Sequence, residues 1–245
     1  MTGHTVVSQK EWLDARLALL AKEKAFTRQQ DELVRERQQL PWVRVEKAYT
    51  FETPDGKKTL AELFGDKSQL LLYHFMFGPE QQEGCPSCSM AADTLNGNYS
   101  HLHGRDIELV MVSRGPLNKF TPFKGRMGWT LPWVSSYGTT FNRDFGVTFT
   151  PEELQDGTDY NFGTSRPYGG QEMHGLSAFY KGEDGTVYHS YSSYGRGAEP
   201  LLAVYPLLDM APKGRDEEEL PYPMAWVRHH DRYEAAKPAA MCCAH

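Results

Sequence analysis

Two cysteines separated by two residues are the clearest chemical signal in this sequence. Cys85 and Cys88 stand in the run Gly84-Cys85-Pro86-Ser87-Cys88. The thiolate is the nucleophile in disulfide exchange, and a free cysteine with a pKa of about 8.5 is mostly protonated at neutral pH. A helix that begins at this run would stabilise the thiolate, and Pro86 suits a first helical turn. The spacing therefore predicts a redox-active dithiol in which Cys85 attacks and Cys88 resolves the mixed disulfide.

The same spacing also occurs in half of a zinc site, so metal binding is an alternative. Two further ligands would be needed, and Cys242, Cys243 and His245 could supply them from the tail. Structural zinc ligands are usually compact in sequence, which favours the redox interpretation. The two tail cysteines could also pass electrons to the main dithiol. With 4 cysteines in 245 residues, a disulfide framework is a poor explanation for their presence.

Composition narrows the class of protein. The chain is 40% hydrophobic, enough for one large globular domain, and its formal net charge is -6 with a pI near 5.9. Such a charge has no general attraction for phosphate backbones or anionic membranes. No segment reaches the roughly 20 consecutive apolar residues of a membrane span, and no secretory signal pattern is visible. We therefore expect a cytoplasmic protein with no nucleic acid and no membrane as partner.

The segments around the dithiol predict the element that positions it. Residues 69–77 form a nearly continuous apolar run of strand length, typical of a strand buried on both faces. Residues 89–102 have a helical pattern, and residues 107–113 form a second buried strand. This order predicts a βαβ unit with parallel strands and a right-handed crossover, and the dithiol lies at the start of its helix.

The rest of the chain predicts three regions: a helical extension at 1–41, a domain at 42–211, and a linker and tail at 212–245. A long charged helix at 8–40 with an apolar stripe ends before Pro41, and it could pack on the domain or form a homodimer with a second copy. Within the domain the pattern predicts a strand (43–51), a helical turn (58–64), a helix (116–124), a strand (133–136), a helical turn (141–147), a loop (150–170), a hairpin (176–180 with 186–191) and a last helix (199–208).

Several segments resemble the successive landmarks of peroxiredoxin-like thioredoxin folds: Leu70–Val112, Leu131–Ser135, Phe145–Val147 and Ala178–Gly185. Over nearly its full length the chain resembles a bacterial-type thioredoxin-like family, described as a domain of unknown function and thought to contain dithiol-disulfide oxidoreductases. The long helix, the dithiol run and the tail Trp226–Tyr233 carry this resemblance. It implies an α/β three-layer fold with a central mixed sheet. It also implies a thiol-disulfide oxidoreductase without a cofactor, acting on protein or small-molecule disulfides or thiols.

One departure from relatives concerns the residue that faces the dithiol. Thioredoxins place a cis-proline there, whereas Pro132 resembles a strand-start proline of peroxiredoxin-like proteins. The facing position is then expected near His174. By resemblance to copper chaperones of the superfamily, His174 could join Cys85 and Cys88 around copper or zinc, although those chaperones have three residues between the cysteines. His174 could equally be a general base or a hydrogen-bonded loop histidine.

A thiol peroxidase is a further alternative. Peroxiredoxins carry a Pro-x-x-x-Thr/Ser-x-x-Cys pattern with a supporting arginine, and here Pro79 and Gly84 precede Cys85 in a different arrangement. Arg114 or Arg126 could supply the arginine. Disulfide exchange is therefore preferred, while the substrate, the electron donor and the direction of exchange stay open.

A charged residue beside the dithiol and a charged run in the tail carry two further predictions. Glu83 is negative and is expected to raise the thiol pKa, with no obvious cation to offset it. In the tail, the run His229-His230-Asp231 lies between Trp226 and Tyr233, which predicts a short segment that docks on the domain.

Overall fold

The computed structural model describes residues 3–168 and 170–233, so Cys242, Cys243 and His245 lie outside the described residues. The chain divides into two compact units, residues 1–42 and 43–245. The boundary expected at residue 212 stays a prediction. Among the described residues, no helix combines the length and apolar character that a membrane span needs.

The first unit is built on one helix, α1 (Gln9–Gln38), close to the predicted range. A capping box starts it: the Glu11 amide donates to Ser8 Oγ at 3.3 Å, and the Ser8 amide donates to a Glu11 carboxylate oxygen at 3.0 Å. No residue of α1 is buried. Four large apolar side chains recur every seven residues and are all more than half exposed: Trp12, Leu19, Phe26 and Leu33. A seven-residue period of this kind is typical of a helix that pairs with another helix.

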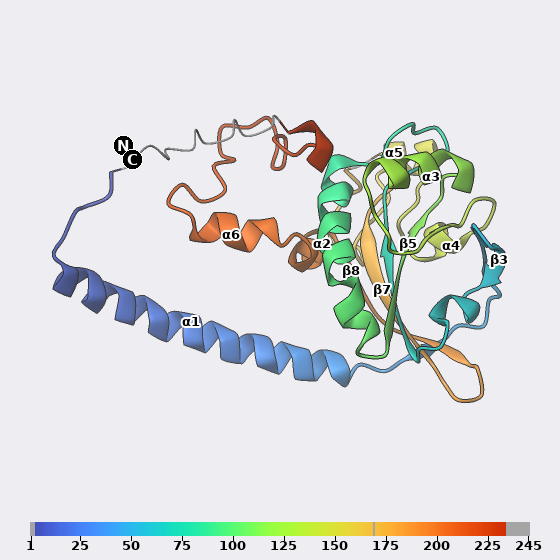
Figure 1. Ribbon diagram of the computed structural model, residues 1–245, viewed down its shortest axis with the longest axis horizontal. Coiled ribbons are helices and arrows are strands. Elements are labelled where there is room, and N and C mark those ends of the chain that lie inside the picture. Colours follow the sequence, from blue (N-terminus) through green and yellow to red (C-terminus); the bar gives the residue numbers. More distant parts are fainter. Residues whose placement is uncertain (1–2, 169, 234–245) are drawn as a thin grey trace, which may run out of the picture. The chain divides into compact units, whose positions relative to one another are not determined.

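The second unit is built on the sheet drawn in Figure 1. The sheet has eight strands in the order β1-β8-β7-β4-β5-β6-β2-β3. Strand β4 lies near its centre, parallel to β5 and antiparallel to β7, and β5 is parallel to β6. The strands are β1 (Val43–Arg44), β2 (Thr50–Thr53), β3 (Gly56–Thr59), β4 (Gln69–His74), β5 (Ile107–Ser113), β6 (Trp133–Ser135), β7 (Gly175–Lys181) and β8 (Val187–Tyr194). This sheet confirms the expected α/β fold with a central mixed sheet.

Helices and 3-10 turns (η) connect these strands. They are η1 (Glu62–Phe64), α2 (Pro86–His103), α3 (Leu117–Arg126), α4 (Phe141–Asp144), α5 (Pro151–Asp156), η2 (Gly195–Leu201), α6 (Val204–Met210) and η3 (His230–Arg232). The βαβ unit β4-α2-β5 and the hairpin β7-β8 occur where the sequence predicts them, since both follow from local apolar patterns and turn residues.

Four predicted elements differ from those observed. The strand expected at 43–51 is two short strands, β1 and β2, which pair with opposite ends of the sheet. The helical turn expected at 58–64 begins as β3, which forms a hairpin with β2. The expected loop 150–170 contains α5, started by a capping box between Thr150 and Glu153. The helix expected at 199–208 is divided into η2 and α6 around Leu202.

The core lies on both faces of the sheet because alternate residues of a strand point to opposite faces. Leu70 and Leu72 of β4 belong to one hydrophobic cluster, together with η1 and α4. Tyr73 belongs to a second cluster, which includes residues of α2 and α3. Strand β4 is thus buried on both sides, as predicted, and the end of β4 is held rigidly where the chain leads towards the dithiol.

The predicted homodimer through α1 can be tested on its exposed seven-residue stripe. Leu19→Glu combined with Phe26→Glu places charges in that stripe and is expected to convert a dimer into a monomer. Analytical ultracentrifugation measures the mass in solution. Ala21→Glu, about 200° around the helix from Leu19, is the control and should leave the dimer intact. A monomeric wild-type protein, or a dimer that survives the double substitution, would contradict the prediction.

Candidate functional site

The dithiol lies where the sequence predicts, at the N-terminus of α2. Cys85 is the residue that caps the helix and Pro86 occupies its first turn. The amide of Ser89 donates to the Cys85 carbonyl at 2.9 Å, and the amide of Cys85 donates to the Met76 carbonyl at 3.3 Å. Cys85 is partly exposed whereas Cys88 is buried, and both are free thiols. The partly exposed sulfur can meet a substrate, while the buried one is reached through Cys85.

The two thiols have opposite pKa shifts. A hydrogen bond from the Cys88 thiol, followed by the amide groups of Cys88 and Ser87, lowers the pKa of Cys85 to about 7 against the opposing effect of burial. Burial raises the pKa of Cys88, and the neighbouring Cys85 raises it further. Near neutral pH the arrangement therefore holds a thiolate on Cys85 and a thiol on Cys88.

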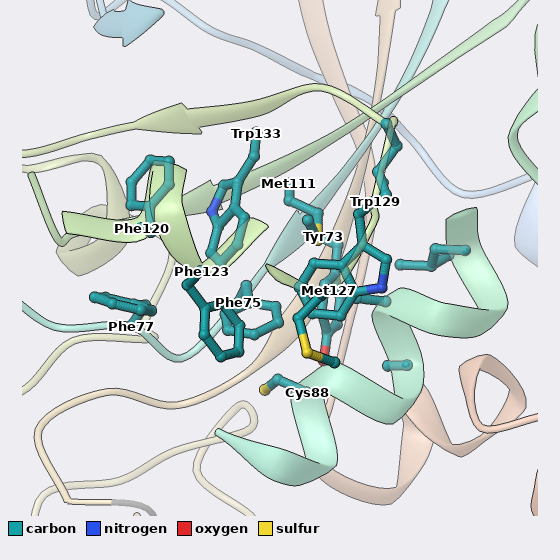
Figure 2. Packing of buried hydrophobic residues seen from close by; sticks show 14 of the residues in the cluster. Tyr73, Phe75, Phe77, Cys88, Met111, Phe120, Phe123, Met127, Trp129 and Trp133 are labelled. Atoms are coloured by element: carbon teal, nitrogen blue, oxygen red, sulfur yellow. The ribbon is translucent and has the colours of Figure 1, made fainter. Parts of the chain in front are cut away.

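Tyr73 of β4 is a site residue that the sequence analysis did not single out. Its phenol hydrogen-bonds to Cys88, and this bond lowers the pKa of Cys88 against the larger effect of burial. Tyr73 itself is fully buried, and burial together with both thiols raises its pKa. Figure 2 shows Cys88 at one end of the aromatic cluster that contains Tyr73. Only the pairing of β4 with its neighbours brings this hydroxyl under the dithiol, so a local motif could not reveal it.

His174 lies immediately before β7, close to the position expected to face the dithiol, and lines the same pocket as Cys88. Its Nε2 lies 3.2 Å from the Gly195 carbonyl, to which it donates, and its Nδ1 lies 3.3 Å from the Tyr168 hydroxyl. Burial lowers the pKa of His174, so the ring is neutral at pH 7. Both ring nitrogens are therefore engaged with protein groups.

The structure does not bring the alternative metal ligands Cys85, Cys88 and His174 together as a site. Within residues 3–168 and 170–233, no three His, Cys, Asp or Glu side chains are placed to hold a metal ion. Cys85, Cys88 and His174 thus share a region without forming a ligand cluster. Pro132 directly precedes β6, and its carbonyl accepts from the Met111 amide at 2.9 Å, as expected of a strand-start proline.

The predicted docking of the tail is confirmed, and it occurs on the loop that leads to the dithiol. His229 is 3% exposed, and its Nε2 donates to the carbonyl of Gly84 at 2.8 Å. Arg126 of α3 donates to His229 Nδ1 at 2.6 Å, which places the ring proton on Nε2. We call residues 229–232 the C-terminal clamp. It holds the backbone one residue before Cys85.

Glu83 differs from the sequence-based expectation because two arginines offset its charge. Arg126 donates to Glu83 at 2.5 Å, and Arg232 of the C-terminal clamp donates at 2.8 Å. The hydrogen bond from Arg232, followed by that from Arg126, lowers the pKa of Glu83. The expectation that Glu83 would raise the thiol pKa is therefore wrong: its charge is neutralised locally, and the Cys85 pKa is lowered.

The two arginines considered for a peroxidase role both bind carboxylates. Arg114 donates to Glu172 at 2.6 Å, whereas Arg126 binds Glu83 and also forms an ion pair with Asp231 at 3.2 Å. These contacts give Arg126 a structural task in the C-terminal clamp.

Gly84 fits a space that no side chain could enter. A Cβ atom added there would lie 2.6 Å from a ring carbon of Phe75 and 2.7 Å from a ring carbon of Phe123. Both rings belong to the buried cluster that supports α2 and α3. The dithiol is therefore positioned by backbone packed directly on the aromatic core.

Gly84→Ala is expected to displace this loop and to lower the free energy of unfolding by about 1–3 kcal/mol, the usual cost of overpacking a core. Gly97→Ala within α2 is the matched control, because a Cβ there has no neighbour within 4 Å. It should stabilise the helix by about 0.5–1 kcal/mol. Urea denaturation, monitored by circular dichroism, measures the free energy of unfolding of both variants. Equal stability of the two variants would show that the Gly84 packing is unimportant.

Alkylation of Cys85 is expected to follow a titration with a midpoint at about pH 7, because only the thiolate reacts. The rate should rise as the pH passes this value. In Cys88→Ala the thiol hydrogen bond is lost, so the midpoint should move to higher pH. Iodoacetamide labelling with mass-spectrometric detection of the Cys85 peptide gives the rate, and Gly97→Ala is the control. A midpoint above pH 8.5 in the wild type would contradict the prediction.

Comparison with solved structures finds chains of the peroxiredoxin class at low identity. A peroxidoxin, BcpB, from Mycobacterium tuberculosis is 16% identical, with a TM-score of 0.43, covering 67% of this chain and 94% of its own. A PrxQ mutant from Xylella fastidiosa is 15% identical, with a TM-score of 0.42, covering 65% and 88%. A mitochondrial 2-Cys peroxiredoxin from Plasmodium falciparum is 11% identical, with a TM-score of 0.41, covering 68% and 91%.

No curated protein matches the chain. One family model does, over residues 1–233, and it therefore includes the α1 helix, the dithiol and the C-terminal clamp. On this match the chain belongs to the family described as "Bacterial protein of unknown function (DUF899)".

Proposed function

We propose that this protein is a thiol-disulfide oxidoreductase that cycles Cys85 and Cys88 between dithiol and disulfide. The observation that carries the proposal is the asymmetry of the pair: a partly exposed sulfur with a lowered pKa at a helix N-terminus, next to a buried thiol with a raised pKa. The first can attack at neutral pH while the second stays protonated until it is needed.

The exchange proceeds in two balanced steps. The Cys85 thiolate attacks one sulfur of a substrate disulfide, the substrate S–S bond breaks, and the leaving thiolate takes a proton from solvent. Cys88 then loses its proton and attacks the Cys85 sulfur, which forms the Cys85–Cys88 disulfide and releases the second substrate thiol. The phenol of Tyr73 hydrogen-bonds to Cys88 and so favours its thiolate as that proton leaves.

Disulfide exchange is favoured over the alternatives considered from the sequence. It requires only the two cysteines and the groups that hydrogen-bond to them. A peroxidase would use an arginine beside the thiolate, but Arg114 and Arg126 bind carboxylates. A copper or zinc site would use His174, whose two nitrogens bind Gly195 and Tyr168.

Cys85→Ser is expected to abolish disulfide reduction, measured as dithiothreitol-dependent reduction of a low-molecular-weight disulfide, because the attacking thiolate is gone. Cys88→Ser should instead accumulate a mixed disulfide on Cys85, seen as a mass increase in the intact protein. Both are made in a Cys242→Ser/Cys243→Ser background, which removes the tail thiols, and that background alone is the control. Unchanged activity in Cys85→Ser would refute the proposal. The reduction potential of the pair then decides between a reductase and an oxidase.

A further inference from the structure

A pocket of about 480 Å³ opens beside the dithiol. Ser87, Cys88 and Ala91 of α2 contribute to one wall, and Tyr168 and His174 contribute to another. Most of the remainder is formed by residues of η2, α6 and the segment 215–224, which come from the C-terminal part of the second unit. The pocket is large enough for a small molecule. Its lining includes Cys88 but not Cys85, whose sulfur is hydrogen-bonded to the Cys88 thiol and so lies next to the pocket. We call it the dithiol pocket.

The charged side chains of the dithiol pocket are paired with each other or with neighbours. Arg215 donates to Glu199 at 2.6 Å and to Asp209 at 2.7 Å, and its guanidinium lies 4.2 Å from the ring centre of Tyr205. Arg196 forms an ion pair with Glu199 at 3.1 Å. These contacts direct the Arg215 guanidinium towards two protein carboxylates, whereas the Arg196 side chain is 87% exposed and its charge is screened by solvent.

Glu217, the other acid of this lining, is similarly engaged. One of its carboxylate oxygens accepts from the Tyr205 hydroxyl at 2.8 Å, from the Met224 amide at 3.0 Å and from the Trp226 indole at 2.6 Å. These hydrogen bonds contribute to the lowered pKa of Glu217, so it is ionised at pH 7 and its charge is solvated by neutral groups of the protein. Both carboxylates of the lining, Glu199 and Glu217, thus have partners within the protein.

Close to the thiols the pocket is uncharged. His174 is neutral and engaged at both nitrogens. Met76, Leu202 and Met224 add apolar surface to the lining. A ligand that carries a carboxylate or an ammonium group would therefore lose its hydration without gaining an ionic partner among the side chains that line this part of the pocket, which disfavours binding. An apolar ligand with a few neutral polar groups meets no such cost.

We infer that the dithiol pocket binds a small, uncharged, largely apolar disulfide and presents it to the dithiol. The inference rests on the proposed function and names its substrate class. One R–S–S–R molecule is reduced to two R–SH molecules while Cys85 and Cys88 are oxidised to their disulfide, with two electrons transferred. An external dithiol reductant, such as dithiothreitol in the assay, takes up the oxidising equivalents and restores the dithiol.

The substrate class is tested with disulfides of similar size and different charge. The neutral probe is bis(2-hydroxyethyl) disulfide, the anionic probe is 3,3′-dithiodipropionate and the cationic probe is cystamine. Each kcat/KM is divided by the rate of the same disulfide with dithiothreitol alone, which removes intrinsic reactivity. The full-length protein is expected to prefer the neutral probe over both charged probes by about tenfold or more, because an unpaired charge costs at least that much on desolvation.

A charge placed in the pocket wall gives a second, independent readout. Leu202→Glu is expected to lower kcat/KM for the neutral probe by about tenfold and to raise the relative activity with cystamine. Leu202→Gln has nearly the same shape without the charge and should change the preference much less. Leu207→Glu is the matched control, because Leu207 on α6 is 67% exposed and does not line the pocket. Circular dichroism verifies that all three variants are folded.

The outcomes separate this inference from the proposed function. Equal normalised activity with all three probes, or a preference that Leu202→Glu leaves unchanged while folded, would overturn the substrate class and leave the disulfide exchange standing. Absence of turnover with every probe in the wild type, with no protection of Cys85 and Cys88 in thiol trapping, would overturn the proposed function and the substrate class together.

Discussion

The close approach of Gly84 to the aromatic core is the constraint on which the site depends. The rings of Phe75 and Phe123 fill the space that a side chain at Gly84 would need. Phe75 directly follows β4, and Phe123 lies on α3, so two elements of the core define where this backbone can run. The next residue is Cys85, whose amide donates to the Met76 carbonyl. Rigid packing of the core is thereby transmitted to a reactive sulfur one residue away.

The C-terminal clamp also binds the backbone of this loop. His229 reaches the Gly84 carbonyl from 145 positions further along the chain, and Arg126 bridges His229 to Glu83. The acid that stands two residues before Cys85 is thus balanced by two arginines instead of acting on the thiolate. Local neutralisation leaves the pKa of Cys85 under the control of Cys88 and of the amide groups at the helix start.

The same principle of internal pairing extends to the dithiol pocket. Arg215 pairs with Glu199 and Asp209, Glu217 accepts hydrogen bonds from neutral groups such as the Tyr205 hydroxyl, and the histidine nearest the thiols is neutral. For the function proposed above, such a pocket would select a substrate by shape and apolar contact more than by charge. The Cys85 thiolate would then be the charged group that attacks the bound disulfide.

The sequence by itself determined the dithiol, the helix that starts at it, the strands β4 and β5 on either side, and the β7-β8 hairpin. Those features depend on local patterns: a proline at a helix start, apolar runs of strand length and a turn with Asp184-Gly185. Only the tertiary structure decided what surrounds the sulfurs. Tyr73 under Cys88, the arginines on Glu83 and the paired charges of the pocket come from residues distant in sequence. The division of 43–51 between the two opposite halves of the sheet was also a long-range outcome, because strand pairing depends on partners that a local pattern does not specify.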